Sequence, residues 1–152
     1  MGEVLSRSEL KIRLEDLKKS KKIVFTNGCF DLLHVGHVRY LQDAKALGDF
    51  LVVAVNSDAS VKRLKGDSRP LQQDLDRAEI LAALRSVDYV TIFEEDTPRD
   101  LIESLTPNVL VKGGDWPVEK IEGSQHVLSA GGEVRSLPFH DGRSTTKIIE
   151  KM

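Results

Sequence analysis

Residues 23–37 read IVFTNGCFDLLHVGH, and this segment changes in character from strand to helix along its length. The apolar, β-prone run Ile23–Thr26 stops at Asn27-Gly28, a pair that favours a turn. From Val35 to Leu47 the apolar residues recur at helical spacing, and Gly48 follows as a helix-ending residue. The segment therefore predicts a strand, a loop and a helix.

The same alternation continues on both sides of this segment. Leu10, Leu14 and Leu17 recur at helical spacing behind Ser8, which predicts an N-capped lead-in helix over 9–19. Further strands are expected at 50–55, 87–93, 109–111 and 133–137, and further helices at 76–84, 98–106 (N-capped by Thr97), 118–130 and 144–151. The polar stretch 65–74 is expected to be a long loop.

Strands that alternate with helices predict an α/β, Rossmann-like fold. We expect a five-stranded parallel sheet with helices on both faces, because parallel strands need crossover connections. The chain divides into a lead-in helix over 1–21 and a domain over 22–152. In such sheets ligands bind beyond the carboxyl ends of the strands, so the site is expected there.

Composition narrows the class of protein. The chain has 152 residues, with 22 Lys+Arg against 24 Asp+Glu and a formal net charge of −2, so a nucleic-acid partner is not expected. Cys29 is the single cysteine, which leaves no intramolecular disulfide and suits a reducing compartment. No apolar run approaches the roughly 18 residues of a membrane span, and the charged N-terminal segment does not fit a secretory signal. We expect a cytoplasmic protein that does not act on membranes.

His34 and His37 stand three residues apart where the first predicted helix begins. Side chains at this spacing share one helix face, beside free backbone N–H groups and the positive end of the helix dipole. Gly36 lets a phosphate approach the backbone, so the arrangement suits a polyphosphate. The alternatives are ordinary surface or capping histidines, or a zinc site, although neither His126 nor His140 shows metal-ligand spacing. P-loop and dinucleotide fingerprints are absent.

Three ordered motifs carry a resemblance to a known family. GCFDLLHVGH at 28–37 resembles the H-x-G-H signature of the nucleotidyltransferase superfamily, and VKGGDW at 111–116 and RSTT at 143–146 look like its later motifs. The set is most similar to the heptose 1-phosphate adenylyltransferases that make ADP-heptose for lipopolysaccharide, over about Lys22 to Met152. The family's sheet order is 3-2-1-4-5 in the numbering of the five predicted strands, which would place the 28–37 and 111–116 motifs at one crevice.

The resemblance implies an enzyme in which a sugar 1-phosphate attacks the α-phosphorus of ATP and pyrophosphate leaves, with Mg²⁺ present. His34, His37 and Lys65 would be the catalytic residues. The nucleotide-binding positions expected on this basis are Thr26, Gly28, Cys29, Phe30, Gly36, Arg69, Arg143, Ser144, Thr145 and Thr146. The substrate-binding positions are Asp31, Lys112, Gly113, Asp115 and Trp116. No residue is assigned as a metal ligand.

Several alternatives stay open at this point. Asp31 either orients a lysine or a metal-bound water or caps a loop, and Trp116 either packs on the sugar or closes the core. Related glycerol-phosphate cytidylyltransferases carry an arginine where this chain has Phe139, which disfavours CTP. A cytidylyltransferase acting on glycerol 3-phosphate and an inactive nucleotide-binding regulatory module remain the alternatives. The partners expected are ATP, a sugar 1-phosphate, a second copy in a homodimer and a functional link to a separate heptose kinase.

Overall fold

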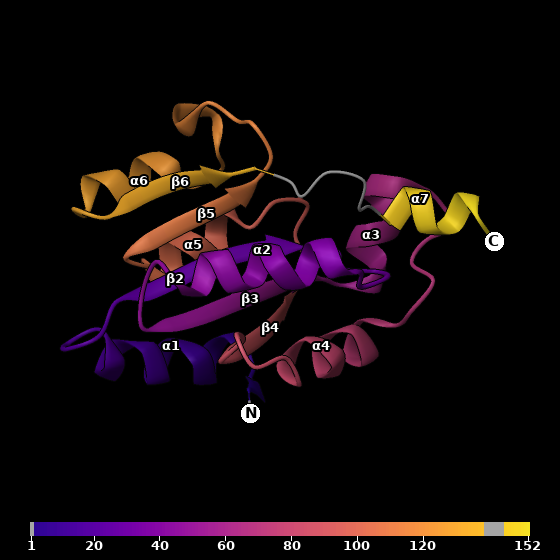
Figure 1. Cartoon of the computed structure of the whole chain (residues 1–152). Coiled ribbons are helices and arrows are strands. Elements are labelled where there is room, and N and C mark those ends of the chain that lie inside the picture. The colour runs from indigo at the N-terminus through magenta and orange to yellow at the C-terminus, as the bar shows by residue number, and fades with distance from the viewer. Residues whose placement is uncertain (1, 139–144) are drawn as a thin grey trace.

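The structure, a computed structural model, describes residues 2–138 and 145–152 as alternating strands and helices (Figure 1). The elements in chain order are β1 (Glu3–Val4), α1 (Arg7–Leu17), β2 (Ile23–Gly28), α2 (Val35–Lys45), β3 (Phe50–Asn56), α3 (Asp58–Lys65), α4 (Asp74–Ala82), β4 (Tyr89–Phe93), α5 (Arg99–Leu105), β5 (Val109–Gly113), the 3₁₀ helix η1 (Val118–Lys120), α6 (Ser124–Ser129), β6 (Glu133–Leu137) and α7 (Thr145–Glu150). None of the described helices is long and apolar enough to cross a membrane.

Within the described residues the strands form one six-stranded parallel sheet in the order β1-β4-β3-β2-β5-β6. The five strands expected from the sequence keep the predicted order, because β4-β3-β2-β5-β6 is 3-2-1-4-5 in their own numbering. The prediction of five strands is corrected by β1, an edge strand whose Glu3 pairs with Tyr89 of β4. Its two residues are both exposed, so no apolar run marked it in the sequence.

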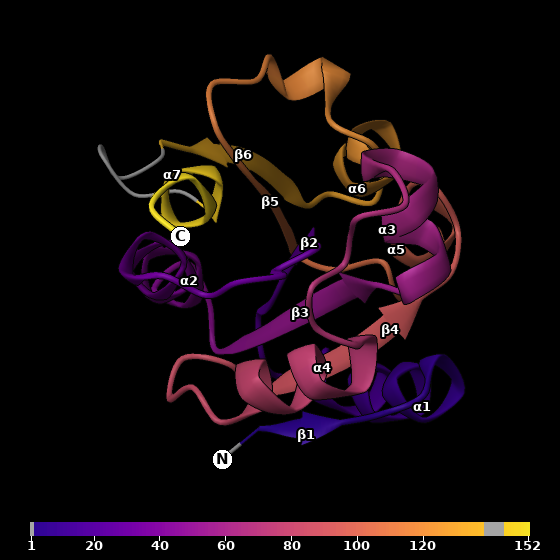
Figure 2. The ribbon, with the colours of Figure 1, turned by 90° about the vertical axis from the view of Figure 1, so that its right-hand side faces the viewer.

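Helices cover both faces of the sheet, as expected (Figure 2). Successive residues of a strand point to opposite faces, so Phe25 packs with α1 and α5 while Val24 packs with α2 and α4. Leu10 and Leu14 of α1 are buried in the first of these two cores. The N-terminal helix therefore shares the core of the sheet.

The N-terminal half of the chain differs from the prediction in three places. Helix α1 begins at Arg7, because Ser6 and not Ser8 forms the cap, in a capping box with Glu9. Helix α3 occupies residues that were not expected to be helical, and Lys65 is its last residue rather than part of a loop. The loop itself is shorter than expected and lies between α3 and α4, which begins at Asp74.

In the C-terminal half, the helix expected over 118–130 is divided into η1 and α6. Ile121 between them is extended and buried, and Gly123 adopts a left-handed conformation at φ 83°, which ends helical pairing. Helix α5 begins one residue later than expected, with Pro98 at the cap position and the Thr97 hydroxyl accepting the Arg99 N–H at 3.4 Å.

Candidate active site

Two stacked imidazoles mark the start of α2. His34 occupies the N-cap position with extended backbone, and its ring lies 3.9 Å from the ring of His37, centroid to centroid, at 27°. The edge of Phe30 packs against His37 at 5.3 Å between ring centroids. The pair expected from sequence spacing is therefore brought together on one face, above the positive end of an eleven-residue helix.

His37 is held in its neutral form. Burial lowers its pKa to about 4, and the charges of His34 and Lys65 act in the same direction. The backbone N–H of His34 donates to Nδ1 of His37 at 3.3 Å. Because Nδ1 accepts this bond, the single proton of the neutral ring sits on Nε2. His37 thus offers an N–H donor without carrying a charge.

The turn after β2 is shaped by Gly28 and Phe30. Phe30 has a positive φ of 48°, which folds its ring back over the strand end. A Cβ placed on Gly28 would come within 2.8 Å of Cε2 of that ring. The predicted role of both residues in a nucleotide pocket stays a prediction, but their mutual packing sets the path of the chain into the H-x-G-H segment.

Thr26 holds helix α2 against the sheet. Its hydroxyl and the Tyr40 hydroxyl lie 2.7 Å apart, and Thr26 is fully buried. Burial raises the pKa of Tyr40 to about 12, so the phenol stays protonated and can donate this hydrogen bond. The side chain of Thr26 therefore contacts α2 directly, one turn beyond His37.

Asp31 is turned inward and fastens the loop between α3 and α4. Its carboxylate accepts hydrogen bonds from the Arg69 guanidinium at 2.6 Å and from the backbone N–H groups of Leu71 and Gln72 at 2.8–2.9 Å. Burial opposes ionisation of Asp31, but these donors outweigh it and lower its pKa. This is the loop-capping arrangement, and it brings two predicted site residues, Asp31 and Arg69, into one ion pair.

The charge of Lys65, an exposed residue at the end of α3, acts on the histidine pair. Its positive charge is among the causes that lower the pKa of His37, and it also acts to lower the pKa of the Cys29 thiol. Burial outweighs that effect and raises the pKa of Cys29, whose Sγ lies 3.7 Å from the Asn56 side-chain oxygen. Cys29 is therefore a protonated thiol beside the site and not a nucleophile.

Sequence reasoning missed Arg77 of α4, a fully buried arginine at the carboxyl ends of the strands. Its guanidinium donates to the carbonyl oxygens of Cys29, Asn56 and Gln72 and to the Asp58 carboxylate. A signal existed, because Arg77 lies four residues before the buried Leu81 and so on the apolar face of the helix.

The VKGGDW motif begins at the end of β5, and β5 pairs directly with β2. The two motifs therefore leave the sheet from neighbouring strands, as the expected strand order required. Lys112 Nζ lies 5.1 Å from the centre of the Trp116 ring, and Trp116 is 48% exposed, so it does not close the core. Asp115 is also exposed, and Gly113 pairs with Leu137 of β6.

The third motif is described only in part. Arg143 and Ser144 lie outside the described residues, as does Phe139, on which the preference for ATP over CTP depends. Thr145 and Thr146 form the first turn of α7. Their roles, and those of Arg143 and Ser144, stay predictions.

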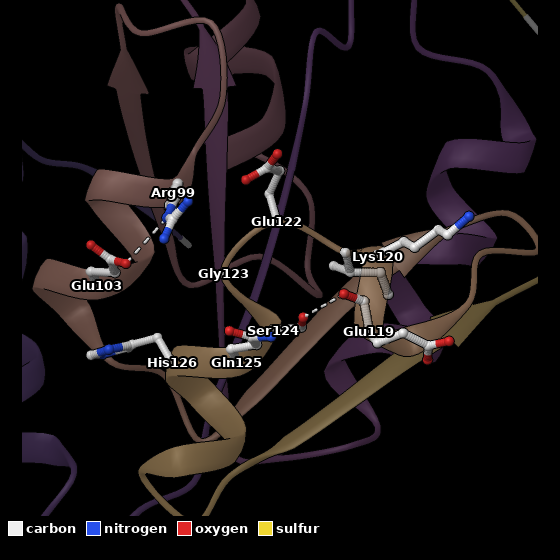
Figure 3. Close-up of a pocket in the computed structure, with 10 residues that line it drawn as sticks. Arg99, Glu103, Glu119, Lys120, Glu122, Gly123, Ser124, Gln125 and His126 are labelled. Carbon is white, nitrogen blue, oxygen red and sulfur yellow. Dashed lines mark hydrogen bonds and ion pairs between the residues drawn. The ribbon is translucent and has the colours of Figure 1, made fainter.

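A separate cavity of about 180 Å³ lies between α5 and the η1–α6 segment (Figure 3). Its walls mix both charge signs, with Arg99 and Lys120 beside Glu103, Glu119 and Glu122. It contains none of the residues predicted for the site. Among the described residues, no cluster of three His, Cys, Asp or Glu side chains could hold a metal ion.

The chain is similar in sequence to known proteins. The sequence profile of the family described as cytidylyltransferase-like matches residues 25–151. The bifunctional protein HldE of Marinomonas sp. is 58% identical over 97% of this chain and 31% of its own length, and that of Geobacter metallireducens is 63% identical over 88% of this chain and 27% of its own. The chain thus spans under a third of the length of these curated relatives.

Solved structures resemble the fold as well. The lipopolysaccharide core biosynthesis protein from Thermoplasma volcanium superposes with a TM-score of 0.65 at 28% identity, over 80% of this chain and 98% of that protein. Pantoate-beta-alanine ligase from Francisella tularensis superposes with a TM-score of 0.62 at 17% identity, over 96% of this chain and 69% of the ligase, and shows the fold alone.

Proposed function

Because the chain belongs to the cytidylyltransferase-like family, we propose that it is a nucleotidyltransferase that moves AMP from ATP to a heptose 1-phosphate. The products are ADP-heptose and pyrophosphate. The observation that carries the proposal is the stacked pair His34 and His37 at the start of α2, with the charge of Lys65 close by. The similarity to HldE proteins and to a lipopolysaccharide core biosynthesis protein supports the sugar-nucleotide class.

The reaction forms a bond between a sugar-phosphate oxygen and the α-phosphorus of ATP, and it breaks the bond from that phosphorus to pyrophosphate. The attacking phosphate is already anionic near pH 7, so the site needs no general base. Catalysis then depends on orientation and on stabilising negative charge in the transition state. The Nε2–H of neutral His37 and the ammonium of Lys65 are the donors for this task.

The neutral form of His37 lowers the desolvation cost of binding ATP. A neutral imidazole loses less hydration on closure of the site than an imidazolium does, yet it still donates a hydrogen bond. The helix dipole of α2 adds positive potential at the same place. These groups together favour a triphosphate over a neutral ligand.

Mg²⁺ is proposed to arrive with ATP, held by phosphate oxygens and water. Mg²⁺ commonly binds in this way, with few protein ligands, and the described residues form no cluster that would cage it. Asp31 is already committed to Arg69 and to two backbone N–H groups. The ion would neutralise part of the phosphate charge, and the residues of the chain would orient the reactants.

The proposed preference for ATP rests on Phe139, and the proposed heptose substrate rests on the set of three sequence motifs. Lys112, beside the exposed ring of Trp116, is the candidate to receive the sugar phosphate. The proposed substrate is a sugar 1-phosphate, and we propose that a heptose kinase activity is linked to its supply.

The test is pyrophosphate release by the full chain with Mg²⁺, with ATP or CTP against heptose 1-phosphate or glycerol 3-phosphate. We expect turnover only for ATP with the heptose phosphate. His34→Ala should lower kcat by about 10²–10³. The matched control is His126→Ala, since His126 contacts Thr106 on the other face of the sheet and should leave the rate within about twofold of wild type. Turnover with CTP and glycerol 3-phosphate, or full activity in His34→Ala, would contradict the proposal.

A further inference from the structure

We propose that Arg77 is a positioning residue that sets where Lys65 and Arg69 stand relative to the histidine pair. This inference rests on the proposed nucleotidyl transfer. Arg77 is fully buried, and it acts through its contacts with the elements that carry the site residues.

The Arg77 side chain makes four hydrogen bonds. Arg77 is fully buried, and its Nη1 donates to the carbonyl oxygens of Cys29 and Asn56, both at 2.8 Å. Its Nε donates to the carbonyl of Gln72 at 2.9 Å, and Nη2 donates to the Asp58 carboxylate at 2.8 Å. A rigid planar fork thus joins the end of β2, the β3–α3 junction and the loop before α4.

The four partners of Arg77 belong to segments that lead to predicted site residues. Cys29 is the first residue beyond β2 and leads into the H-x-G-H segment, and Asn56 is the last residue of β3. Asp58 begins α3, the helix that ends at Lys65, and Gln72 belongs to the loop that carries Arg69. Arg77 therefore fixes the spacing between the two strand ends and the segment that holds both predicted phosphate-binding side chains.

Reciprocal hydrogen bonds also join the starts of α3 and α4, the two helices that carry Asp58 and Arg77. The carboxylate of Asp58 accepts the backbone N–H of Asp74, and the carboxylate of Asp74 accepts the backbone N–H of Asp58, at 2.8 and 3.0 Å. The N-termini of α3 and α4 thus cap each other. The C-terminal end of the loop between these helices is thereby tied to the start of α3, and Asp31 holds the middle of the loop through Arg69, Leu71 and Gln72.

A lysine cannot reproduce this arrangement. Its ammonium is a single point with three donors, so it can satisfy the strand-end carbonyls or the loop, but not all four points in one plane. Arg77→Lys keeps the charge and most of the volume, and it releases the loop from the strand ends. A displacement of about 1 Å at a reacting group costs about 10²-fold in rate.

The experiment is a double-mutant cycle on kcat/KM for ATP, measured by pyrophosphate release with the full chain. Lys65→Ala is expected to lower kcat/KM by about 100-fold in the wild-type background. In the Arg77→Lys background the same change should cost under about tenfold, because Lys65 is already displaced. The matched control cycle pairs Arg77→Lys with Lys112→Ala, whose ammonium lies over the Trp116 ring at the end of β5, and should be additive within about twofold.

Three outcomes decide the matter. The proposal is supported if the effects of Arg77→Lys and Lys65→Ala on kcat/KM are coupled while those of Arg77→Lys and Lys112→Ala are additive. It is overturned if both cycles are equally additive or equally coupled, because Arg77 would then have a purely structural role. If Arg77→Lys does not fold, the cycle is repeated with Asp58→Ala, which removes one contact of Arg77 from a partly exposed position, and the same criteria apply. Absence of turnover in the wild-type protein would instead refute the proposed function.

Discussion

Acidification from pH 7.5 to pH 4.5 should destabilise the wild-type fold more than the fold of His37→Asn. Burial, together with the charges of His34 and Lys65, lowers the pKa of His37 to about 4 in the folded chain, whereas an unfolded histidine keeps a value near 6.5. Between these two values the unfolded chain binds a proton that the folded chain does not. Stability is therefore fully present above about pH 6.5 and falls as the pH drops towards 4.

The magnitude follows from the two pKa values. The gap between 6.5 and about 4 corresponds to about 3.4 kcal/mol when the whole titration is traversed. His37 is only partly buried, so solvent screening reduces the effect. We expect the wild type to lose about 1–2 kcal/mol relative to His37→Asn between pH 7.5 and pH 4.5.

The assay is urea unfolding of both proteins at several pH values, followed by circular dichroism. Asparagine is the chosen replacement because its side-chain oxygen can accept the His34 N–H in place of Nδ1. Groups remote from position 37 contribute alike to both proteins, so their effects cancel in the difference. A difference that stays constant with pH, or that favours the wild type in acid, would refute the claim that His37 is neutral in the folded state.

Three further changes have defined outcomes. Asp31→Asn should raise the KM for ATP about tenfold in steady-state kinetics. It should also abolish the loss of stability at low pH that the lowered pKa of Asp31 creates, as measured by thermal melts at pH 3–7. Tyr40→Phe removes the hydrogen bond to Thr26 and should lower the free energy of unfolding in urea by about 0.5–1.5 kcal/mol. An unchanged free energy of unfolding would contradict the buried contact. Gly28→Ala forces the Phe30 ring to move and should lower kcat by about tenfold or more, so a fully active variant would show that the turn tolerates the added carbon.

The course of the polypeptide was predictable because strand and helix signals are local. Apolar runs and helical spacing predicted the strand and helix around residues 23–45, whereas the order of the five longer strands was an expectation from the family resemblance. Helix α3 was missed because its sequence is polar, with Val61 buried among lysines and an arginine. Strand β1 was missed because it is two residues long and its pairing with β4 is a contact across most of the chain.

The same division runs through the candidate site. The residue types at 28–37 and their spacing indicated a phosphate-binding helix start, because neighbours on a helix surface lie three or four residues apart. The sequence allowed two roles for Asp31. Its contact with Arg69 was not predictable because Arg69 lies in a loop about forty residues further along the chain. The sequence also allowed either a core or a surface position for Trp116. Its exposure depends on where the chain turns after β5.

The sequence by itself thus determined the parallel α/β architecture and the placement of the histidine pair, since both depend on periodicity over a few residues. Only the tertiary structure decided that His37 is neutral and that Arg77 joins two strand ends to a loop. Those properties depend on burial and on contacts between distant residues, and a pattern along one chain carries no direct record of either.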